Sequence, residues 1–157
     1  MCHILNSIEE VLVAKGFDFD MRFDAEQNQH LFILNFPGEN GRFALVWTII
    51  QEHSQMMLVS TFPIYAPKAA HSLIITMLNR INITIRLGSF ELDEKSGHIR
   101  LRHTFYFNAD LPFSEKLVMD NLAISLVTMD QRIPEIMSVM HAGQSNKSQS
   151  ALPFWCN

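Results

Sequence analysis

Apolar residues recur at helical spacing in three separate segments of the chain. Over residues 3–15 the repeating positions are Ile4, Leu5, Ile8, Val11 and Leu12. Gly16 follows them as a natural C-terminal stop. A second stripe runs from Pro67, tolerated in a first helical turn, to Ile81. A third begins at Ser114, a good N-cap, and continues to about Met140. The pattern therefore predicts three amphipathic helices.

Between these helices the hydrophobic pattern changes to period two. Within residues 17–29, positions 17–24 alternate aromatic or methionine residues with charged ones, which predicts a short, half-buried strand. Residues 30–36, 42–50 and 56–65 are rich in branched and aromatic residues and are separated by turn-forming residues. The gaps are too short for crossover helices, so these strands form an antiparallel meander. Residues 87–107 predict a further two-stranded hairpin that turns at Ser96-Gly97.

The predicted order is helix, three or four strands, helix, two-stranded hairpin and helix. Strands grouped before and after a helix, without regular alternation, indicate an α+β domain. We expect an antiparallel sheet with three α-helices packed on it, formed as one domain by residues 1–142. Residues 143–157 are mostly small and polar before a final Leu-Pro-Phe-Trp run, which predicts a flexible C-terminal tail.

Composition narrows the class of protein. Hydrophobic residues make up 48% and charged residues 18% of the chain, as in globular domains. The net charge of −4 disfavours non-specific nucleic-acid binding. The N-terminus lacks the basic region of a signal peptide, and no apolar run approaches the roughly 18 residues of a membrane helix. Cys2 and Cys156 form no disulfide framework, so we expect free thiols and a cytoplasmic location.

No motif of enzymatic chemistry is present. The chain lacks G-x-S-x-G, P-loop, G-x-G-x-x-G and H-E-x-x-H patterns, and its six glycines fall at turns or helix ends. His98 and His103 would face opposite sides of a strand, so they cannot chelate a metal as a local pair. We therefore predict no enzyme activity, cofactor, metal or small-molecule substrate. The alternative is a small enzyme that uses His103, which interrupts an apolar face.

The hairpin LGSFELDEKSGHIRLRHTFYF (87–107) carries charges that resemble a reactive or nucleic-acid-binding surface. Its register must match apolar with apolar side chains, because a slip of one residue would turn the core face outward. Any such register places Glu91 and Asp93 on the same face as Arg100 and Arg102. We therefore predict cross-strand ion pairs that stabilise the register.

The last predicted helix is rich in methionine. The chain has nine methionines, and Met119, Met129, Met137 and Met140 fall on this helix. Flexible thioethers either fill gaps in a core or adapt to varied partners, and both interpretations stay open. We expect the sheet face and this helix to form the contact surface, with Met119, Leu122, Met129 and Ile133 as the hypothetical protein-binding residues. Pro134 lies inside the helix and is predicted to kink or split it.

Residues 78–107 resemble the signature of YbjN-like proteins. The matching positions are Leu78-Asn79, Asn82, Gly88-x-Phe90-x-Leu92-Asp93, Gly97, Ile99, Leu101-Arg102 and the aromatic strand end. The resemblance extends more loosely over residues 3–140. These bacterial proteins are often labelled sensory transduction regulators, and they share the fold of class I type III secretion chaperones. The resemblance implies three helices against a curved antiparallel sheet and frequent dimers, and it supplies no catalytic residues.

The expected function is therefore binding without chemistry. We predict a cytoplasmic, non-enzymatic regulator or chaperone-like adaptor that binds a protein partner or itself as a homodimer. The alternative within the same fold is a dedicated type III secretion chaperone for one secreted client.

Overall fold

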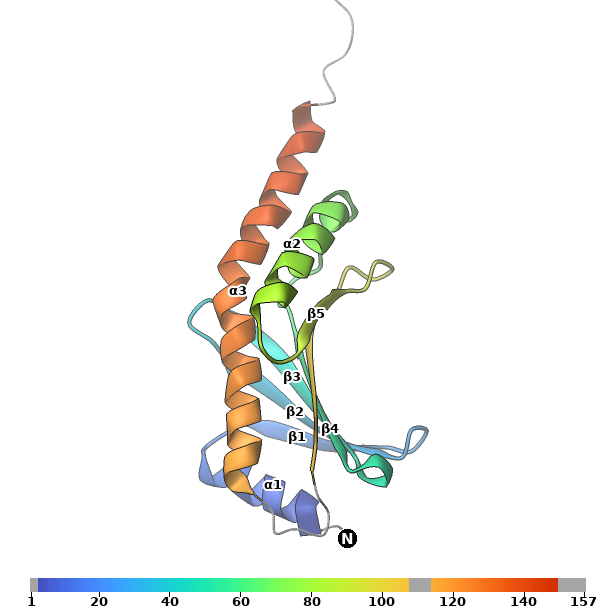
Figure 1. The fold of residues 1–157 in the computed structure, drawn as a ribbon, viewed down its shortest axis with the longest axis vertical. Coiled ribbons are helices and arrows are strands. Elements are labelled where there is room, and N and C mark those ends of the chain that lie inside the picture. The colour runs from blue at the N-terminus through green and yellow to red at the C-terminus, as the bar shows by residue number, and fades with distance from the viewer. Residues whose placement is uncertain (1–2, 108–113, 150–157) are drawn as a thin grey trace, which may run out of the picture.

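The structure, a computed structural model, describes residues 3–107 and 114–149 and contains one six-stranded antiparallel sheet. Three α-helices pack on one side of this sheet (Figure 1). The strand order across the sheet is β1-β2-β3-β4-β6-β5. The helices are α1 (His3–Ala14), α2 (His71–Thr84) and α3 (Glu115–Gln149). The strands are β1 (Phe19–Asp24), β2 (Gln29–Pro37), β3 (Arg42–Ile50), β4 (Gln55–Thr61), β5 (Ser89–Leu92) and β6 (Ile99–Tyr106). The predicted α+β class and element order are confirmed.

Alternation along the central strands produces the core. Phe32, Trp47 and Leu58 lie side by side in the register of β2, β3 and β4, and none of them is exposed. Because side chains alternate across a strand, the same register directs their neighbours to the opposite side of the sheet. The helices cover the first of these two sides, which we call the inner face, and the other is the outer face.

Helix α1 ends as its sequence predicts. Gly16 has a left-handed φ of 74°, which a glycine adopts without a steric penalty. The N–H of Gly16 bonds to the carbonyl of Val13, and the N–H of Phe17 bonds to that of Leu12, both at 3.0 Å. This is the Schellman pattern of helix termination. It turns the chain directly into β1.

Helix α3 is longer than predicted. Ser114 caps it as expected, since its Oγ accepts the N–H of Leu117 at 3.2 Å. Pro134 does not split the helix, but the upper half of α3 leans away from the line of its lower half in Figure 1. The helix continues past Met140 to Gln149, because one glycine is not enough to end a long helix. The predicted start of the tail at residue 143 therefore falls within α3, and residues 150–157 lie outside the described residues.

Candidate protein-binding surface

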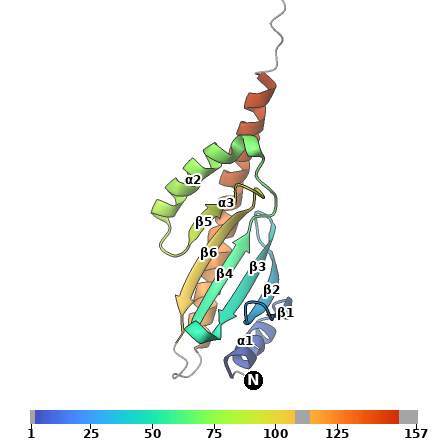
Figure 2. The same ribbon diagram turned by 90° about the vertical axis from the view of Figure 1, so that its right-hand side faces the viewer.

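The outer face of the sheet carries a group of apolar side chains that no helix covers. Figure 2 looks onto this face, with α3 behind the strands. The register aligns Ile33, Val46 and Val59 in one row across β2, β3 and β4. The group, which we call the outer patch, consists of half-buried Leu31, Ile33, Val46, Met57 and Val59. An apolar surface of this kind, in contact with water, is typical of an interaction site.

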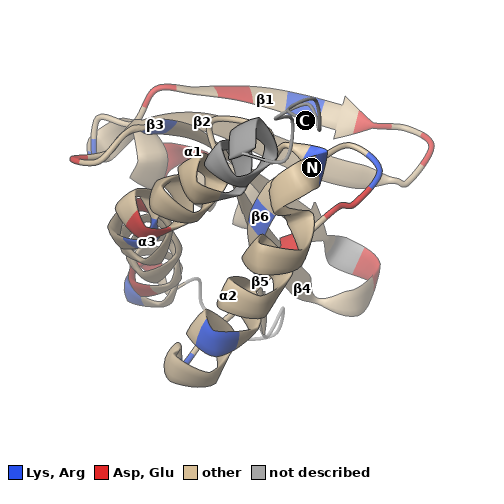
Figure 3. Cartoon of the chain, turned by 90° about the horizontal axis from the view of Figure 1, so that it is seen from above, with Lys and Arg blue, Asp and Glu red and all other residues tan. Residues whose placement is uncertain are grey.

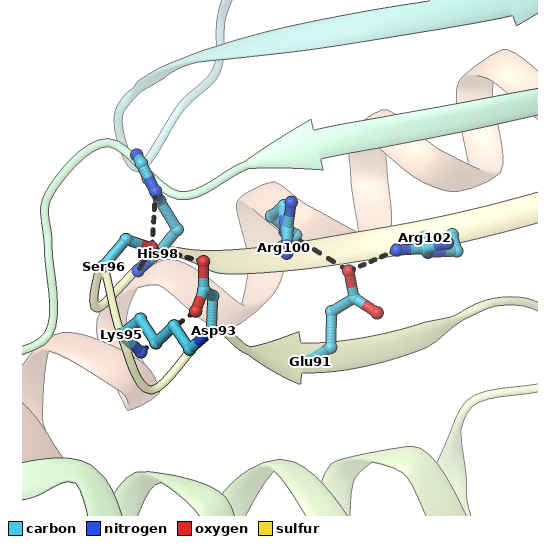
Figure 4. Close-up of polar contacts among 7 residues, drawn as sticks. All are labelled: Glu91, Asp93, Lys95, Ser96, His98, Arg100 and Arg102. Carbon is cyan, nitrogen blue, oxygen red and sulfur yellow. Dashed lines mark hydrogen bonds and ion pairs between the residues drawn. The ribbon is translucent and has the colours of Figure 1, made fainter. Parts of the chain in front are cut away.

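Opposite charges lie at the two ends of the row that contains Ile33 and Val59. On the β1 side, Asp20 pairs in register with Ile33, and Arg22 beside it pairs with Leu31. On the β6 side, Arg102 pairs in register with Val59. Glu91 on β5 contacts both arginines, with its Oε1 3.2 Å from Arg100 Nε and 2.8 Å from Arg102 Nη2 (Figure 4). The predicted cross-strand pairing is therefore confirmed for Glu91, and it partly neutralises the arginines that a phosphate would need.

The predicted ion pair of Asp93 is not formed, because both arginines pair with Glu91, although the charge of Arg100 contributes weakly to lowering the pKa of Asp93. Strand β5 ends at Leu92, so Asp93 lies at the start of the turn. Its carboxylate accepts the hydroxyl of Ser96 at 2.7 Å and the N–H of Lys95 at 3.0 Å (Figure 4). The hydrogen bond from Ser96 lowers the pKa of Asp93, and the bond from Lys95 acts in the same direction. Asp93 thus stabilises the turn rather than the strand pairing.

Two of the signature residues, Asn82 and Gly88, support the hairpin. Asn82 on α2 donates from Nδ2 to the carbonyl of Phe90 at 3.0 Å and accepts the N–H of Phe90 at 2.7 Å. Its side chain therefore satisfies the backbone of β5 as a neighbouring strand would. Gly88 has φ +78°, and a Cβ there would lie only 2.8 Å from the carbonyl oxygen of Arg102. Because these two residues act on the backbone of the hairpin, the motif identifies a fold.

An open cleft of about 950 Å³ lies where the α1–β1 connection meets the ends of β2, β3 and β4. Its apolar walls include Phe17, Leu34, Phe36 and Phe43. His98 lies at its margin, where its ring packs against Tyr65 with centroids 4.4 Å apart. The cleft presents aromatic surface without a group of catalytic residues, so it is suited to holding an apolar side chain.

His103 is buried in the core. Only 3% of its surface is exposed, and its Nδ1 has no hydrogen-bond partner among the described residues. Burial lowers the pKa of His103, while a hydrogen bond with Asn121 on α3 opposes that shift. His103 is not among the residues that line the cleft. His103 is therefore a core residue that lies apart from this cleft.

The predicted binding residues of α3 face mainly inward. Leu122 and Met129 are completely buried, Ile133 is 5% exposed, and Met119 is partly buried against the core. Of the two interpretations left open for this helix, burial favours the core for Leu122, Met129 and Ile133. The exposed apolar side chains of α3 are instead Leu117, Ile124 and Val127. A partner contact by the four predicted residues stays a prediction.

A sheet face was expected to take part in binding, but the residues of the outer patch were not named, although the sequence carries a signal for them. Residues 30–36 and 42–50 are nearly continuous apolar runs, whereas a sheet with one solvated face alternates apolar and polar residues. Continuous runs are typical of strands that are covered on both faces. Here helices cover only one face, and the second apolar set forms most of the outer patch.

In the part of the chain that the structure describes, no three His, Cys, Asp or Glu side chains converge in a way that could hold a metal ion. Within residues 3–107 and 114–149, none of the helices has the length and apolar character needed to cross a membrane.

Comparisons with known proteins agree with this arrangement. The sequence model of the YbjN family, described as "Putative bacterial sensory transduction regulator", matches residues 5–137. The crystal structure of YbjN from E. coli, "a putative transcription regulator", has a TM-score of 0.57 at 13% identity, covering 83% of this chain and 92% of its own. An uncharacterized protein from Methanothermobacter thermautotrophicus has a TM-score of 0.56 at 12% identity, covering 90% of this chain and 96% of its own. Identities this low show a shared fold only.

A weaker similarity is to the ExsC–ExsE complex. Its TM-score is 0.49 at 13% identity, with 85% of this chain and 96% of that chain covered, and this level of similarity supports no conclusion. Among curated protein sequences, none matches the chain.

Proposed function

Because the chain belongs to the YbjN family, we propose that it is a non-enzymatic, protein-binding regulator or chaperone-like adaptor that uses the outer patch. The observation that carries this proposal is the apolar character of β2 and β3 on both faces, with helices on one face only. Leu31, Ile33 and Val46 would each become more deeply buried against a partner. Apolar area removed from water contributes about 25 cal/mol per Å² before the costs of association.

The charged borders of the outer patch favour a homodimer as one form of this function. A two-fold axis parallel to the strands would place the Asp20 border of one copy over the Arg102 border of the other. A two-fold axis across the strands would instead place the Arg102 border of one copy over the Arg102 border of the other. We propose the first arrangement, in which the outer patches of two copies pack together in the cytoplasm.

The outer side of α3 is a second proposed contact surface. Leu117 and Ile124 are exposed on this side, whereas Met119 lies on a different face of the helix, where it is partly exposed at the margin of the core. Leu122, Met129 and Ile133 would reach a partner only if α3 moved away from the sheet, because they are buried in the described chain.

Affinity purification from native lysate, followed by mass spectrometry and light scattering, tests the proposal. Val59→Lys places a charge in the outer patch, and Val13→Lys makes the same change at a valine of α1 that is 63% exposed. We expect Val59→Lys to lose its partner or its dimer while remaining folded, and Val13→Lys to keep both. A single secreted protein bound stoichiometrically would identify the client of a secretion chaperone. A monomeric wild-type protein without enriched partners, or equal binding by both variants, would overturn the proposal.

A further inference from the structure

The two edges of the sheet differ in whether their backbone groups are satisfied. At one edge, Asn82 bonds to both backbone groups of Phe90 on β5. At the other, β1 is the outermost strand and lies along the margin of the molecule (Figure 3). Within the described residues, the backbone of β1 makes no hydrogen bond outside its ladder with β2. An open edge of this kind is a template for one more strand.

The side chains along β1 alternate in a way that defines the partner. Phe19, Met21 and Phe23 share the inner side, and Met21 and Phe23 are 51% and 54% exposed. Residues 18–26 carry four carboxylates against one arginine, at positions Asp18, Asp20, Asp24, Glu26 and Arg22. The acidic segments on either side of the arginine are visible along β1 in Figure 3. The free edge of β1 is thus mainly acidic on the outer face of the sheet and apolar on the inner face.

The cleft begins where β1 begins. Phe17 and Asp18, which precede the strand, are among its lining residues. The cleft then continues along Leu34, Phe36 and Phe43. A strand added beside β1 would therefore have one end next to aromatic surface that can accept an apolar side chain. The start of the open edge is thus adjacent to the cleft through Phe17 and Asp18.

We propose that the β1 edge binds an extended segment of another protein in which apolar and basic residues alternate. The segment adds a strand to the sheet, with its basic side chains beside Asp18 and Asp20 and its apolar side chains beside Met21 and Phe23. Its end inserts an apolar side chain into the cleft. This inference rests on the proposed function, that the protein binds proteins, and it names the class of partner.

A second copy of β1 fits the edge less well than a basic segment. Antiparallel self-pairing centred on Arg22 places Asp20 opposite Asp24 and Arg22 opposite itself. Centring on Met21 pairs Asp20 with Arg22 but places Asp18 opposite Asp24. Like charges directly opposite each other destabilise a strand pair, whereas opposite charges stabilise it. The charges of β1 therefore select a partner of the opposite sign.

The test uses a labelled peptide that alternates valine and lysine, with both ends blocked, and measures its binding to the full chain by fluorescence anisotropy. Three control peptides test what binding requires. The first has the same residues in two blocks and tests alternation, and the second alternates valine with glutamate and tests charge. The third is the valine–lysine peptide with N-methyl groups along one edge, which tests backbone hydrogen bonding. The paired protein variants are Asp18→Asn with Asp20→Asn on the edge, and Glu94→Gln in the exposed β5–β6 turn.

We expect the alternating lysine peptide alone to bind. Loss of the two edge carboxylates weakens its affinity about threefold to tenfold, because each opposite-charge pair contributes modestly. Glu94→Gln leaves the affinity unchanged, and added salt lowers the affinity of the wild-type and Glu94→Gln proteins more than that of the Asp18→Asn/Asp20→Asn protein. Equal binding of the block peptide or the N-methylated peptide would overturn strand addition, and no binding of the lysine peptide would overturn the inference as a whole.

The failure of this inference is separable from failure of the proposed function. If lysate partners depend on Val59 while the lysine peptide does not bind, the outer patch binds proteins and the β1 edge does not. If the peptide binds through Asp18 and Asp20 but the lysate yields no partner, the edge inference holds and the outer-patch proposal fails.

Discussion

His103 shows at the scale of one residue how a core position sets a pH dependence. Its ring lies between the sheet and α3, where it meets Asn121 and the edge of Phe105 with ring centroids 5.7 Å apart. Burial disfavours the imidazolium and lowers the pKa of His103 in the folded protein. The unfolded chain, with a His pKa of about 6.5, then binds more protons than the folded chain as the pH falls below that value.

We therefore predict that the free energy of unfolding decreases as the pH falls from about 7 through 6.5, by at most about 1.4 kcal/mol per pH unit from this group. Well above the unfolded pKa the ring is neutral in both the folded and the unfolded chain, so it adds no pH dependence to the free energy of unfolding. The variant His103→Leu removes this part of the dependence, and urea unfolding at a series of pH values measures it. Parallel stability curves for the two proteins would contradict the burial of a neutral histidine.

Asn82 carries a second prediction at this scale. Its amide satisfies both the N–H and the carbonyl of Phe90, so Asn82→Ala leaves two partly buried backbone groups without a partner. We expect a loss of about 1–3 kcal/mol in the free energy of unfolding. Asn79→Ala is the matched control, since Asn79 is an exposed residue of the same helix. Equal losses from the two variants in urea unfolding would show that the contact with β5 contributes nothing.

At the scale of one element, α3 separates a core side from a solvent side. Leu122 has no exposed surface, whereas Val127 is 51% exposed. We predict that Leu122→Lys costs about 3 kcal/mol or more, because it buries a charge and removes a core side chain. Val127→Lys changes stability by less than about 0.5 kcal/mol. Thermal unfolding and light scattering of both variants measure these effects. A folded Leu122→Lys monomer that has lost its partner would instead establish Leu122 as an interface residue.

Periodicity predicted the elements well and their long-range contacts poorly. The alternation of Phe90 and Leu92 with Glu91 is local information, so the hairpin register followed from the sequence. Asp130 accepts the N–H groups of Glu39 and Asn40 at 3.2 and 3.0 Å, and so ties the β2–β3 turn to α3. These partners lie 91 and 90 positions away in the sequence, and no local pattern relates them. The same limit applies to Asn82, whose position in the signature did not reveal its contact with β5.

The inward or outward direction of a helix face also depends on its neighbours. Leu122 and Met129 repeat at spacings that suit a core and a dimer seam equally well. Only the placement of the sheet, which covers these residues, favours one interpretation. The outer patch shows the opposite outcome. Most of its residues belong to nearly continuous apolar runs, which are typical of strands covered on both faces, yet the fold leaves them uncovered on one face. For binding sites, the sequence shows which side chains are apolar, and the fold shows which of them are left uncovered.

At the scale of the whole molecule, protection of the backbone is expected to fall from the middle of the sheet to one edge. The inner side chains of β3 and β4 include Trp47 and Leu58, which are fully buried, while β1 carries the exposed Met21 and Phe23. Amides open locally where few apolar contacts hold them.

We predict that hydrogen exchange is slowest in β3 and β4 and fastest in β1, with β5 slower than β1 because Asn82 holds it. Addition of the alternating valine–lysine peptide should slow exchange in β1 and leave β5 unchanged, because the peptide adds hydrogen bonds only at the open edge. Exchange followed residue by residue by NMR, with Asp18→Asn/Asp20→Asn as the control protein, measures both effects. If β1 in the free protein is as protected as β3, the edge is already covered, and light scattering would then show whether a second copy covers it.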